Sequence, residues 1–225
     1  MIRIDDVHLA LGGRTVLDGI DLTLTEGRIG LIGANGSGKS TLARLLNGLI
    51  LPDRGRVTVD GLDSRRDGRA LRRQVGFVFQ NPDNQIVMPT VAEDLAFGLT
   101  HLGLPRDQIA ARTDEALRRH GLWDLRDHPA HQLSGGQKQL LAIAGVLAMQ
   151  PARIVLDEPT TLLDLRNARD IARRLAALDQ KLVVVTHDLD LLADFDRVVM
   201  IEAGRVAADG PPGPVLAEYA ARMTG

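Results

Sequence analysis

The stretch Gly33-Ala34-Asn35-Gly36-Ser37-Gly38-Lys39-Ser40 decides the fold of this 225-residue chain. It fits the pattern G-x-x-x-x-G-K-[ST], which carries meaning where a strand precedes it and a helix follows it. The mostly apolar residues 28–32 predict the strand, and residues 38–49 have the periodicity of a helix. About 0.002 chance matches are expected at this composition, even before the flanking elements are required. The alternative, a glycine-rich turn with a solvated lysine, is therefore weak, and the stretch predicts a phosphate-binding loop.

Such a loop surrounds phosphate oxygens with successive backbone N–H groups, and the N-terminus of the following helix adds positive potential. We expect Lys39 to reach the β- and γ-phosphates of a nucleotide, and the Ser40 hydroxyl to ligate Mg²⁺. The residues predicted to contact the nucleotide here are Gly33, Asn35, Gly36, Ser37, Gly38, Lys39, Ser40 and Thr41.

The apolar run Ile154-Val155-Leu156 ends in two carboxylates, Asp157 and Glu158. Alone this pattern is weak, because strands often end in acidic turn residues. Together with a phosphate-binding loop it is strong, because open α/β sheets bind ligands at the C-terminal ends of their strands. Asp157 is then expected to hold Mg²⁺, and Glu158 to activate or position an attacking water.

The segment Leu133-Ser134-Gly135-Gly136-Gln137 precedes a helical run that extends to Met149. Ser134 and Gln137 have the spacing of a capping box, which is the purely structural interpretation. Two glycines in a first helical turn are poor helix formers, however, and need a reason. Close approach of the backbone to a phosphate supplies one.

Composition excludes several other classes of protein. Hydrophobic residues make up 44% and charged residues 25%, as in ordinary globular proteins. The 27 basic and 29 acidic residues give a net charge of −2, so we expect no nucleic-acid partner. The absence of cysteine excludes disulfides, thiol nucleophiles and Cys-ligated zinc. The longest apolar run, Leu140–Met149, is about half of what a membrane span needs, and no secretory signal opens the chain, so a cytoplasmic protein is expected.

The pattern along the chain predicts an α/β fold, in which buried strands alternate with helices. The predicted strands are residues 28–32, 75–79, 153–156 and 181–186, and the predicted helices are residues 38–49, 165–178, 189–194 and 215–223. Residues 2–24 and 197–209 are expected to form antiparallel β-structure, the second around a turn at residues 202–205. Residues 87–150 are expected to be helical, with residues 127–131 as a loop. We therefore predict a single domain over 1–225, with a nucleotide-binding α/β core at about 1–86 and 151–225 and an inserted helical subdomain at about 87–150.

With these motifs the chain resembles the ATP-binding cassette (ABC) ATPase family over nearly all of its 225 positions. The resemblance implies a P-loop NTPase core, ATP and Mg²⁺ as cofactors, and ATP hydrolysis coupled to transport across a membrane. It also implies a dimer, most simply a homodimer, around two ATP molecules. In that dimer Ser134, Gly135, Gly136 and Gln137 of one subunit complete the nucleotide site of the other.

Three further family positions follow in order along the chain. Gln80 matches the loop glutamine that senses Mg²⁺ and the attacking water, Asp164 lies in the loop after the carboxylates, and His187 matches the histidine that contacts the γ-phosphate. A histidine at the end of a strand is, by itself, more often a capping or core residue. The resemblance implies catalytic residues Glu158, His187 and Gln80, Mg²⁺ ligands Ser40, Gln80 and Asp157, and a nucleotide contact at Asp164.

One departure from the family pattern concerns the base of the nucleotide. The family usually places an aromatic residue where it stacks on adenine, and alignment on Val16-Leu17 puts Leu11 at that position. We therefore expect weak discrimination between ATP and GTP.

The segment after Gln80 resembles the ATPases of energy-coupling-factor (ECF) importers, which take up vitamins and transition-metal ions. The resemblance lies in Asn81-Pro82-Asp83-Asn84-Gln85-Ile86-Val87 and in the run Thr90-Val91-Ala92-Glu93-Asp94-Leu95-Ala96-Phe97-Gly98. Thr90 and Glu93 alone indicate only a capping box. The Asn-Pro-Asp-Asn-Gln run, by contrast, has no evident need in folding. In the family this segment lines the groove that receives a helix of the transmembrane partner.

This resemblance implies a transmembrane coupling protein and a substrate-binding membrane protein as partners, and a peripheral location on the inner face of the cell membrane. The short tail after residue 209 favours the ATPase subunit of a biotin importer. A cobalt, nickel or other vitamin importer, or another class of ABC transporter, is the alternative. A small P-loop kinase does not predict the Leu-Ser-Gly-Gly-Gln motif, and a regulatory ATP-binding module without turnover has no use for Glu158 and His187.

Overall fold

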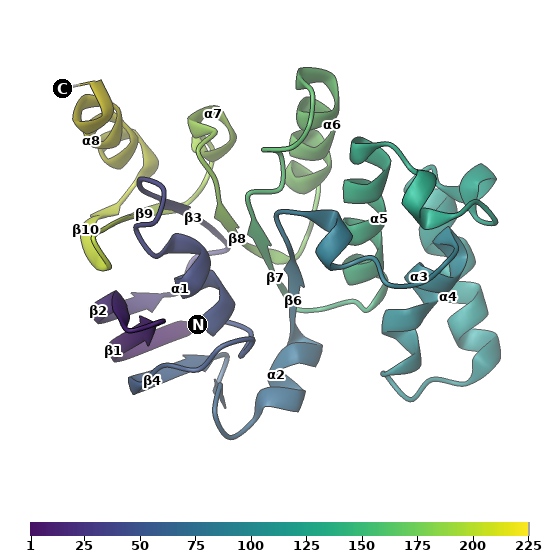
Figure 1. Cartoon of the computed structure of the whole chain (residues 1–225), viewed down its shortest axis with the longest axis horizontal. Helices are drawn as coiled ribbons and strands as arrows, with labels where there is room; N and C mark the ends of the chain where they lie inside the picture. The colour runs from purple at the N-terminus through teal and green to yellow at the C-terminus, as the bar shows by residue number, and fades with distance from the viewer. Residues whose placement is uncertain (225) are drawn as a thin grey trace. The chain divides into compact units, whose positions relative to one another are not determined.

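The structure of the chain, a computed structural model, describes residues 1–224 and contains two compact units (Figure 1). The first unit consists of Met1–Phe77, Arg153–Glu158 and the chain from Gln180 onward. The second unit consists of Val78–Ala152 and Pro159–Asp179. The domain division at residues 86/87 and 150/151 stays a prediction.

A mainly parallel six-stranded sheet organises the first unit. Its strand order is β10-β9-β3-β8-β7-β6. The strands are β3 (Arg28–Ile32), β6 (Val75–Val78), β7 (Arg153–Asp157), β8 (Lys181–Val185), β9 (Arg197–Glu202) and β10 (Arg205–Gly210). β3 pairs in parallel with β8 and β9, β7 pairs in parallel with β8, and β10 runs antiparallel to β9. β7 and β8 are buried along almost their whole length, which explains why both are continuous apolar runs. The α/β prediction, its mainly parallel sheet and its four buried strands are therefore confirmed.

A second, antiparallel sheet in this unit has the strand order β2-β1-β4-β5. Its strands are β1 (Ile2–Leu11), β2 (Arg14–Leu24), β4 (Arg54–Val59) and β5 (Leu62–Asp63). Gly12 and Gly13, with φ of 57° and 76°, form the turn between β1 and β2, and Ala203 and Gly204 form the turn between β9 and β10. Both predicted antiparallel pairs are confirmed. β4, β5 and the helix α2 (Gly68–Gln74) were not predicted.

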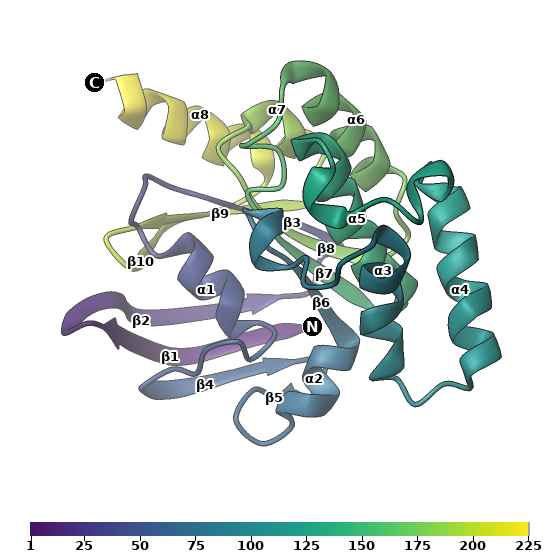
Figure 2. The same ribbon diagram turned by 45° about the vertical axis from the view of Figure 1, so that its right-hand side comes forward.

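Three further helices belong to the first unit. α1 (Lys39–Leu45) contacts β7 and β8 of one sheet and β2 of the other, and it lies between the two sheets in Figure 2. It ends four residues before the predicted boundary, residue 49. α7 (Leu189–Leu192) follows β8, and α8 (Pro212–Thr224) packs against β9 and β10.

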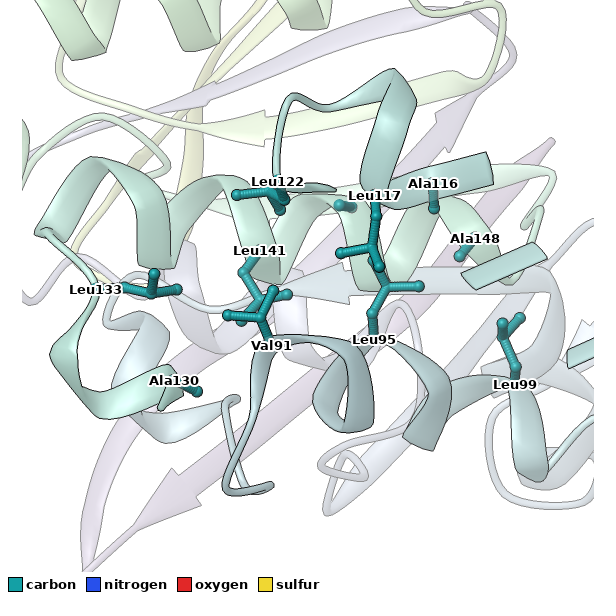
Figure 3. Packing of buried hydrophobic residues seen from close by; sticks show 11 residues of the cluster. Val91, Leu95, Leu99, Ala116, Leu117, Leu122, Ala130, Leu133, Leu141 and Ala148 are labelled. Carbon is teal, nitrogen blue, oxygen red and sulfur yellow. The ribbon is translucent and has the colours of Figure 1, made fainter. Parts of the chain in front are cut away.

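The second unit is helical. Its helices are α3 (Val91–Thr100), α4 (Arg106–Arg119), α5 (Gly135–Ala148) and α6 (Leu165–Ala176), with short 3₁₀ helices at Pro82–Asn84, Trp123–Leu125 and Ala130–Gln132. Figure 3 shows the core that joins α3, α4 and α5. Val91, Leu95 and Leu99 project from successive turns of α3, as a helical repeat of 3.6 residues requires.

The predicted capping boxes begin α3 at Thr90 and α5 at Ser134. Within residues 87–150 the only β-contact that the structure describes is an isolated bridge between Thr90 and Pro129, so the helical prediction is confirmed. The predicted loop at 127–131 is wrong at its end, because the third 3₁₀ helix already starts at Ala130. Among residues 1–224, none of the helices has the length and apolar character needed to cross a bilayer.

Candidate functional site

The predicted phosphate-binding loop joins β3 to α1 in the first unit, and its glycines have two different physical reasons. A Cβ at Gly33 would collide with the carbonyl oxygen of Ile201. At Gly38 it would lie 2.8 Å from the carbonyl oxygen of Val16. Gly36 has a φ of +77°, yet a Cβ there would meet nothing within 4 Å. Gly33 and Gly38 therefore let the loop pack on neighbouring strands, whereas Gly36 faces open space.

The loop is held by the turn between β9 and β10. Gly204 N donates to the carbonyl oxygen of Ser37 at 3.0 Å, and Asp18 N donates to the carbonyl oxygen of Gly204 at 2.9 Å. The Ser37 hydroxyl is buried, and no hydrogen-bond partner for it is found within residues 1–224. A buried hydroxyl without a partner is costly, so a ligand oxygen at the loop would satisfy it.

Lys39 is buried against the same loop. Its Nζ donates to the carbonyl oxygens of Gly33 at 2.7 Å and Ala34 at 2.8 Å. Burial lowers the pKa of Lys39, although the nearby Glu158 and Asp157 carboxylates act in the opposite direction. Lys39 is only 5% exposed, and carbonyl oxygens are the hydrogen-bond acceptors of its ammonium group.

Asp157 at the end of β7 lies beside the start of α1. The Ser40 hydroxyl donates to Asp157 Oδ1 at 2.7 Å. Asp157 Oδ2 is buried and accepts no hydrogen bond from the described part of the chain, and the Arg44 guanidinium lies 3.5 Å away. A hydroxyl and a carboxylate with an unused buried oxygen are hard donors that suit Mg²⁺. Among residues 1–224, no three or more His, Cys, Asp or Glu side chains form a cluster suited to a metal.

Glu158 and His187 come together at the ends of β7 and β8. His187 Nε2 lies 3.1 Å from Glu158 Oε1, and the Glu158 side chain is 6% exposed. Glu158 has a φ of 51°, in the left-handed region where a non-glycine residue costs about 1–2 kcal/mol. Its N–H donates to the Val185 carbonyl oxygen at 2.9 Å, which holds this conformation. Strained backbone of this kind is concentrated at functional sites.

The other predicted site residues lie in the second unit. Ser134 Oγ accepts from Gln137 N at 3.3 Å, and Gln137 Oε1 accepts from Ser134 N at 2.9 Å. Asp164 caps α6, because its two oxygens accept from the N–H and the Nδ2 of Asn167, both at 2.8 Å. A Cβ at Gly136 would lie 2.7 Å from Asn167 Cγ. Gly136 therefore has a packing reason that the sequence did not reveal, beside the predicted approach of a phosphate.

Gln80 is exposed and directly precedes the Asn81-Pro82-Asp83-Asn84-Gln85 run. The expectation that this run has no need in folding is wrong. Asp83 forms an ion pair with Lys138 of α5 at 2.7 Å. Gln85 accepts from Phe79 N at 3.2 Å and donates to the Ala142 carbonyl oxygen at 2.9 Å. The run therefore fastens the segment after β6 to α5.

The structure places the predicted residues in two groups, one in each unit. The first unit brings together the loop at residues 33–41, Asp157, Glu158 and His187. In the second unit, Gln80 and Gly135 line one pocket of about 130 Å³. The sequence missed Arg44, beside Asp157, and Tyr219, whose hydroxyl lies 3.5 Å from His187 Nδ1. No local pattern could have identified Tyr219, because its partners lie 32 or more positions away in the sequence.

Comparison with known proteins identifies the family. A family model described as "ABC transporter" matches residues 17–161, which include the loop, the Ser134–Gln137 segment and both carboxylates. The chain belongs to the ABC transporter family. It is accordingly an ATP-binding subunit with ATPase chemistry, as the motifs of this ABC ATPase predicted.

Relatives of this ABC ATPase include a protein of Deinococcus radiodurans that is provisionally named an ABC transporter ATP-binding protein. It is 58% identical over 224 residues, which cover 100% of this chain and 99% of the relative. The biotin transport ATP-binding protein BioM of Rhodobacter capsulatus is 46% identical, with 99% of this chain and 95% of that protein covered. The energy-coupling factor transporter ATP-binding protein EcfA1 of Symbiobacterium thermophilum is 49% identical, with 91% and 74% covered. These relatives confirm the resemblance to ECF-type ATPases.

Solved structures confirm the P-loop NTPase fold of the ABC ATPase type. CbiO1 of Clostridium perfringens, described as part of the ABC transporter complex CbiONQ, aligns with a TM-score of 0.83 at 37% identity. That alignment covers 99% of this chain and 93% of CbiO1. A dimeric ATP-binding cassette in a post-hydrolysis state, bound to ADP and phosphate, aligns with a TM-score of 0.82 at 29% identity, with 94% and 99% covered.

Proposed function

We propose that this ABC ATPase powers a membrane importer of the ECF type, as a dimer that closes around two ATP molecules. The observation that carries the proposal is the set of groups joined in the first unit. A buried Lys39 lies on the phosphate loop, Ser40 donates to Asp157, whose other carboxylate oxygen accepts no hydrogen bond from the described residues, and Glu158 contacts His187. The ECF assignment rests on the BioM and EcfA1 relatives, and the dimer on the dimeric cassette.

Binding of ATP begins with Lys39 and the loop. The Lys39 ammonium exchanges the carbonyl oxygens of Gly33 and Ala34 for the β- and γ-phosphate oxygens, which are charged and form stronger hydrogen bonds. The loop N–H groups and the Ser37 hydroxyl bind the remaining phosphate oxygens. Ser40, Asp157 and Gln80 would hold Mg²⁺, which when bound neutralises charge on the triphosphate.

Hydrolysis is assigned to Glu158 and His187. Glu158 Oε1 or Oε2 accepts a hydrogen bond from the attacking water and orients it toward the γ-phosphorus. The new bond forms between the water oxygen and phosphorus as the bond to the bridging oxygen of ADP breaks. The water proton passes to Glu158 or to a phosphate oxygen and then to solvent, which leaves ADP and phosphate. We assign His187 to position Glu158 through the 3.1 Å contact and, when ATP is bound, to donate a hydrogen bond to a γ-phosphate oxygen.

Closure of the dimer is assigned to the Ser134–Gln137 segment of each subunit. Because its capping box fixes the start of α5, the backbone there is ordered before ATP arrives. We propose that this segment and Asp164 of one subunit complete the nucleotide site of the other. Closing and reopening then move the segment after Gln80, which transmits the motion to a transmembrane partner.

The partners follow from the same assignment. They are a transmembrane coupling protein and a substrate-binding membrane protein, with the ATPase bound peripherally at the inner face of the membrane. We propose biotin as the transported substrate, because relatives from two organisms that align along nearly their full length are named biotin transport ATP-binding proteins. Another substrate of the same importer class is the second candidate, favoured by the EcfA1 and CbiO1 relatives.

Two variants test the ATPase roles. Lys39→Ala removes the ammonium from the loop and should weaken ATP binding by at least about tenfold in a calorimetric titration, because a charge-assisted contact is worth about 1.5–3 kcal/mol.

Glu158→Gln keeps the shape of the side chain and should bind ATP normally, lose turnover and accumulate as a dimer in size-exclusion chromatography with Mg-ATP. Normal hydrolysis by a monomeric Glu158→Gln variant would contradict the role of Glu158.

The importer is tested in cells. The tagged chain should co-purify with two kinds of membrane protein, and cells that lack the chain should lose biotin uptake. If biotin uptake stays intact and uptake of a different vitamin or metal ion is lost, the proposal of biotin as substrate is wrong and the ATPase assignment still holds.

A further inference from the structure

Tyr219 lies on the C-terminal helix α8 and contacts the predicted nucleotide site of the first unit. It is the single tyrosine of the chain and is 7% exposed. Its hydroxyl lies 3.3 Å from the Gly33 carbonyl oxygen and 3.5 Å from His187 Nδ1. α8, which carries it, is fixed by the buried Val215 and by the ion pair of Arg222 with Glu202 of β9. One side chain thus contacts both the phosphate loop and the histidine assigned to hydrolysis.

The hydroxyl of Tyr219 cannot donate to both neighbours. It has one proton, and the Gly33 carbonyl oxygen can only accept a hydrogen bond. If the proton points to Gly33, the hydroxyl presents only its oxygen to His187 and no longer donates to Nδ1. If the proton points to Nδ1, that nitrogen is bare and the ring proton of a neutral imidazole is on Nε2. Burial, followed by the nearby Glu158 carboxylate, raises the pKa of Tyr219, so the hydroxyl keeps its proton.

The Gly33 carbonyl oxygen has a second donor. Lys39 Nζ donates to it at 2.7 Å, a much shorter contact than the one from Tyr219. While Lys39 donates to this oxygen, the Tyr219 proton is free to point to His187. When Lys39 turns to a phosphate, the carbonyl oxygen loses its main donor, and Tyr219 is the group in place to replace it.

We infer that Tyr219 is a positioning residue that links the state of Lys39 to the orientation of His187; this inference rests on the proposed roles of Lys39, Glu158 and His187. Without ATP, Tyr219 donates to Nδ1, and Nε2–H donates to Glu158 Oε1. With ATP, Tyr219 donates to Gly33 and no longer holds Nδ1. The ring then turns its Nε2–H from Glu158 to a γ-phosphate oxygen, and Oε1 is released from His187 to accept from the attacking water.

The test compares Tyr219→Phe with Val215→Ala in the full-length chain. Tyr219→Phe keeps the ring and removes only the hydroxyl, and we expect about fivefold lower kcat, with KM for ATP and the unfolding midpoint unchanged, because one hydrogen bond is lost. Val215→Ala alters the packing of the same helix at a residue outside the site, so it should lower the unfolding midpoint and leave kcat unchanged. An equal loss of kcat in both variants would reduce Tyr219 to a packing residue and overturn the inference.

A double-mutant cycle separates this inference from the proposed function. His187→Ala should lower kcat strongly, and Tyr219→Phe should add nothing in that background, because the hydroxyl acts through the histidine. If Tyr219→Phe lowers kcat by the same factor with and without His187, the inference fails. If His187→Ala has the kcat of the unaltered chain, the role proposed for His187 fails instead.

A spectroscopic measurement leaves Tyr219 in place. Because Tyr219 is the only tyrosine, incorporation of fluorotyrosine gives a single ¹⁹F resonance. The chemical shift of that resonance reports on the surroundings of the Tyr219 ring. Mg-ATP should shift that resonance in the unaltered chain, and His187→Ala should shift it without nucleotide. A resonance that responds to neither change would overturn the inference, even if the Tyr219→Phe variant did not fold.

Discussion

Single residues of the phosphate loop divide into those that the fold needs and those that a ligand needs. Gly33 is enclosed by the Ile201 carbonyl oxygen and the Ser37 side chain, so its missing Cβ serves packing. Gly36 has a left-handed φ, and a Cβ there would contact no protein atom within 4 Å. The lack of a side chain at Gly36 therefore leaves space for a ligand rather than for packing. A sequence motif marks both glycines alike, and only the neighbours tell them apart.

This division predicts opposite results for Gly33→Ala and Gly36→Ala. Gly33→Ala forces a Cβ into a backbone oxygen and should destabilise the fold by more than about 3 kcal/mol in urea unfolding. Gly36→Ala should lower the unfolding free energy by about 1–2 kcal/mol, because alanine is strained in a left-handed conformation. It should nevertheless weaken ATP binding, since its methyl group occupies space at the phosphates. A Gly36→Ala variant with normal ATP affinity would show that the open side of the loop is not the binding side.

At the scale of elements, the start of α5 illustrates how one residue serves structure and function together. Gly135 and Gly136 follow the Ser134 N-cap, but only Gly136 is crowded, by the Asn167 side chain of α6. Asn167 in turn donates to Asp164, so the two predicted nucleotide-contact segments of the second unit are connected through one amide. Gly136 is thus needed for packing between α5 and α6 whether or not a phosphate approaches it.

The crowding predicts different stabilities for two neighbouring alanines. Gly135→Ala, with no atom closer than 3.9 Å, should stabilise the chain by about 0.5–1 kcal/mol, because alanine favours the helix. Gly136→Ala should destabilise it by about 1–3 kcal/mol through overpacking against Asn167. Urea unfolding measures both. Asn167→Ala should cost less in the Gly136→Ala background than alone, and simple additivity would contradict the contact.

His120, at the C-terminal end of α4, predicts a pH dependence of folding. It lines a pocket of about 140 Å³ with Leu147 of α5 and Arg174 of α6, it is 8% exposed, and its Nδ1 has no hydrogen-bond partner within residues 1–224. Burial, followed by Arg174 and Arg119, lowers its pKa from 6.5 to about 4. The folded chain therefore resists protonation that the unfolded chain accepts below pH 6.5.

The expected loss of stability is confined to one pH window. Above pH 6.5 His120 is neutral in both states and contributes nothing to the pH dependence; between pH 6.5 and about 4 the unfolding free energy should fall by up to about 3 kcal/mol. His120→Leu should flatten that part of the stability profile in urea unfolding. His131→Gln, a change at an exposed histidine, is the matched control and should leave the profile unchanged. If the unfolding free energy of His120→Leu falls with the same slope between pH 6.5 and about 4 as that of the unaltered chain, other groups cause the acid sensitivity.

The sequence predicts best those elements whose burial is continuous. β3, β7 and β8 are mostly apolar because both faces of these strands are buried, so their patterns are visible without tertiary information. β4 begins with exposed Arg54, Gly55 and Arg56 and depends on its pairing with β1. α2 buries only Leu71, so its short helix has no apolar stripe.

The same reasoning explains the site. The loop, Asp157 and Glu158 are local patterns and could be predicted, although their roles stay proposals. The pairs Asp83–Lys138 and Tyr219–His187 join residues 55 and 32 positions apart, and each depends on how distant elements pack. Local periodicity contains no information on such pairs.

For the whole molecule, the proposed dimer is the feature that a single chain cannot complete. Ser134 and Gln137 satisfy each other within their own helix, so the side chains of the capping box need no partner from a second subunit. What remains for a partner is the backbone at the start of α5. Two triphosphates at one interface repel each other, so closure depends on Lys39 and on the contacts of that backbone with phosphate.

Mixing two inactive variants tests this arrangement directly. Lys39→Ala lacks the ammonium of the phosphate loop, and Ser134→Arg blocks the start of α5, so each variant alone should have no ATPase activity. In a heterodimer built as proposed, one site combines both defects and the other combines an intact loop with an intact Ser134. Random pairing of equal amounts gives about half heterodimers, each with one intact site of two, so the mixture should regain about a quarter of the unaltered activity.

If each subunit instead used its own Ser134 segment, every site would contain a defect and the mixture would stay inactive. Chain exchange is verified in the same mixture by pull-down of one variant through a tag on the other, so an inactive mixture that does exchange subunits would refute the proposed dimer.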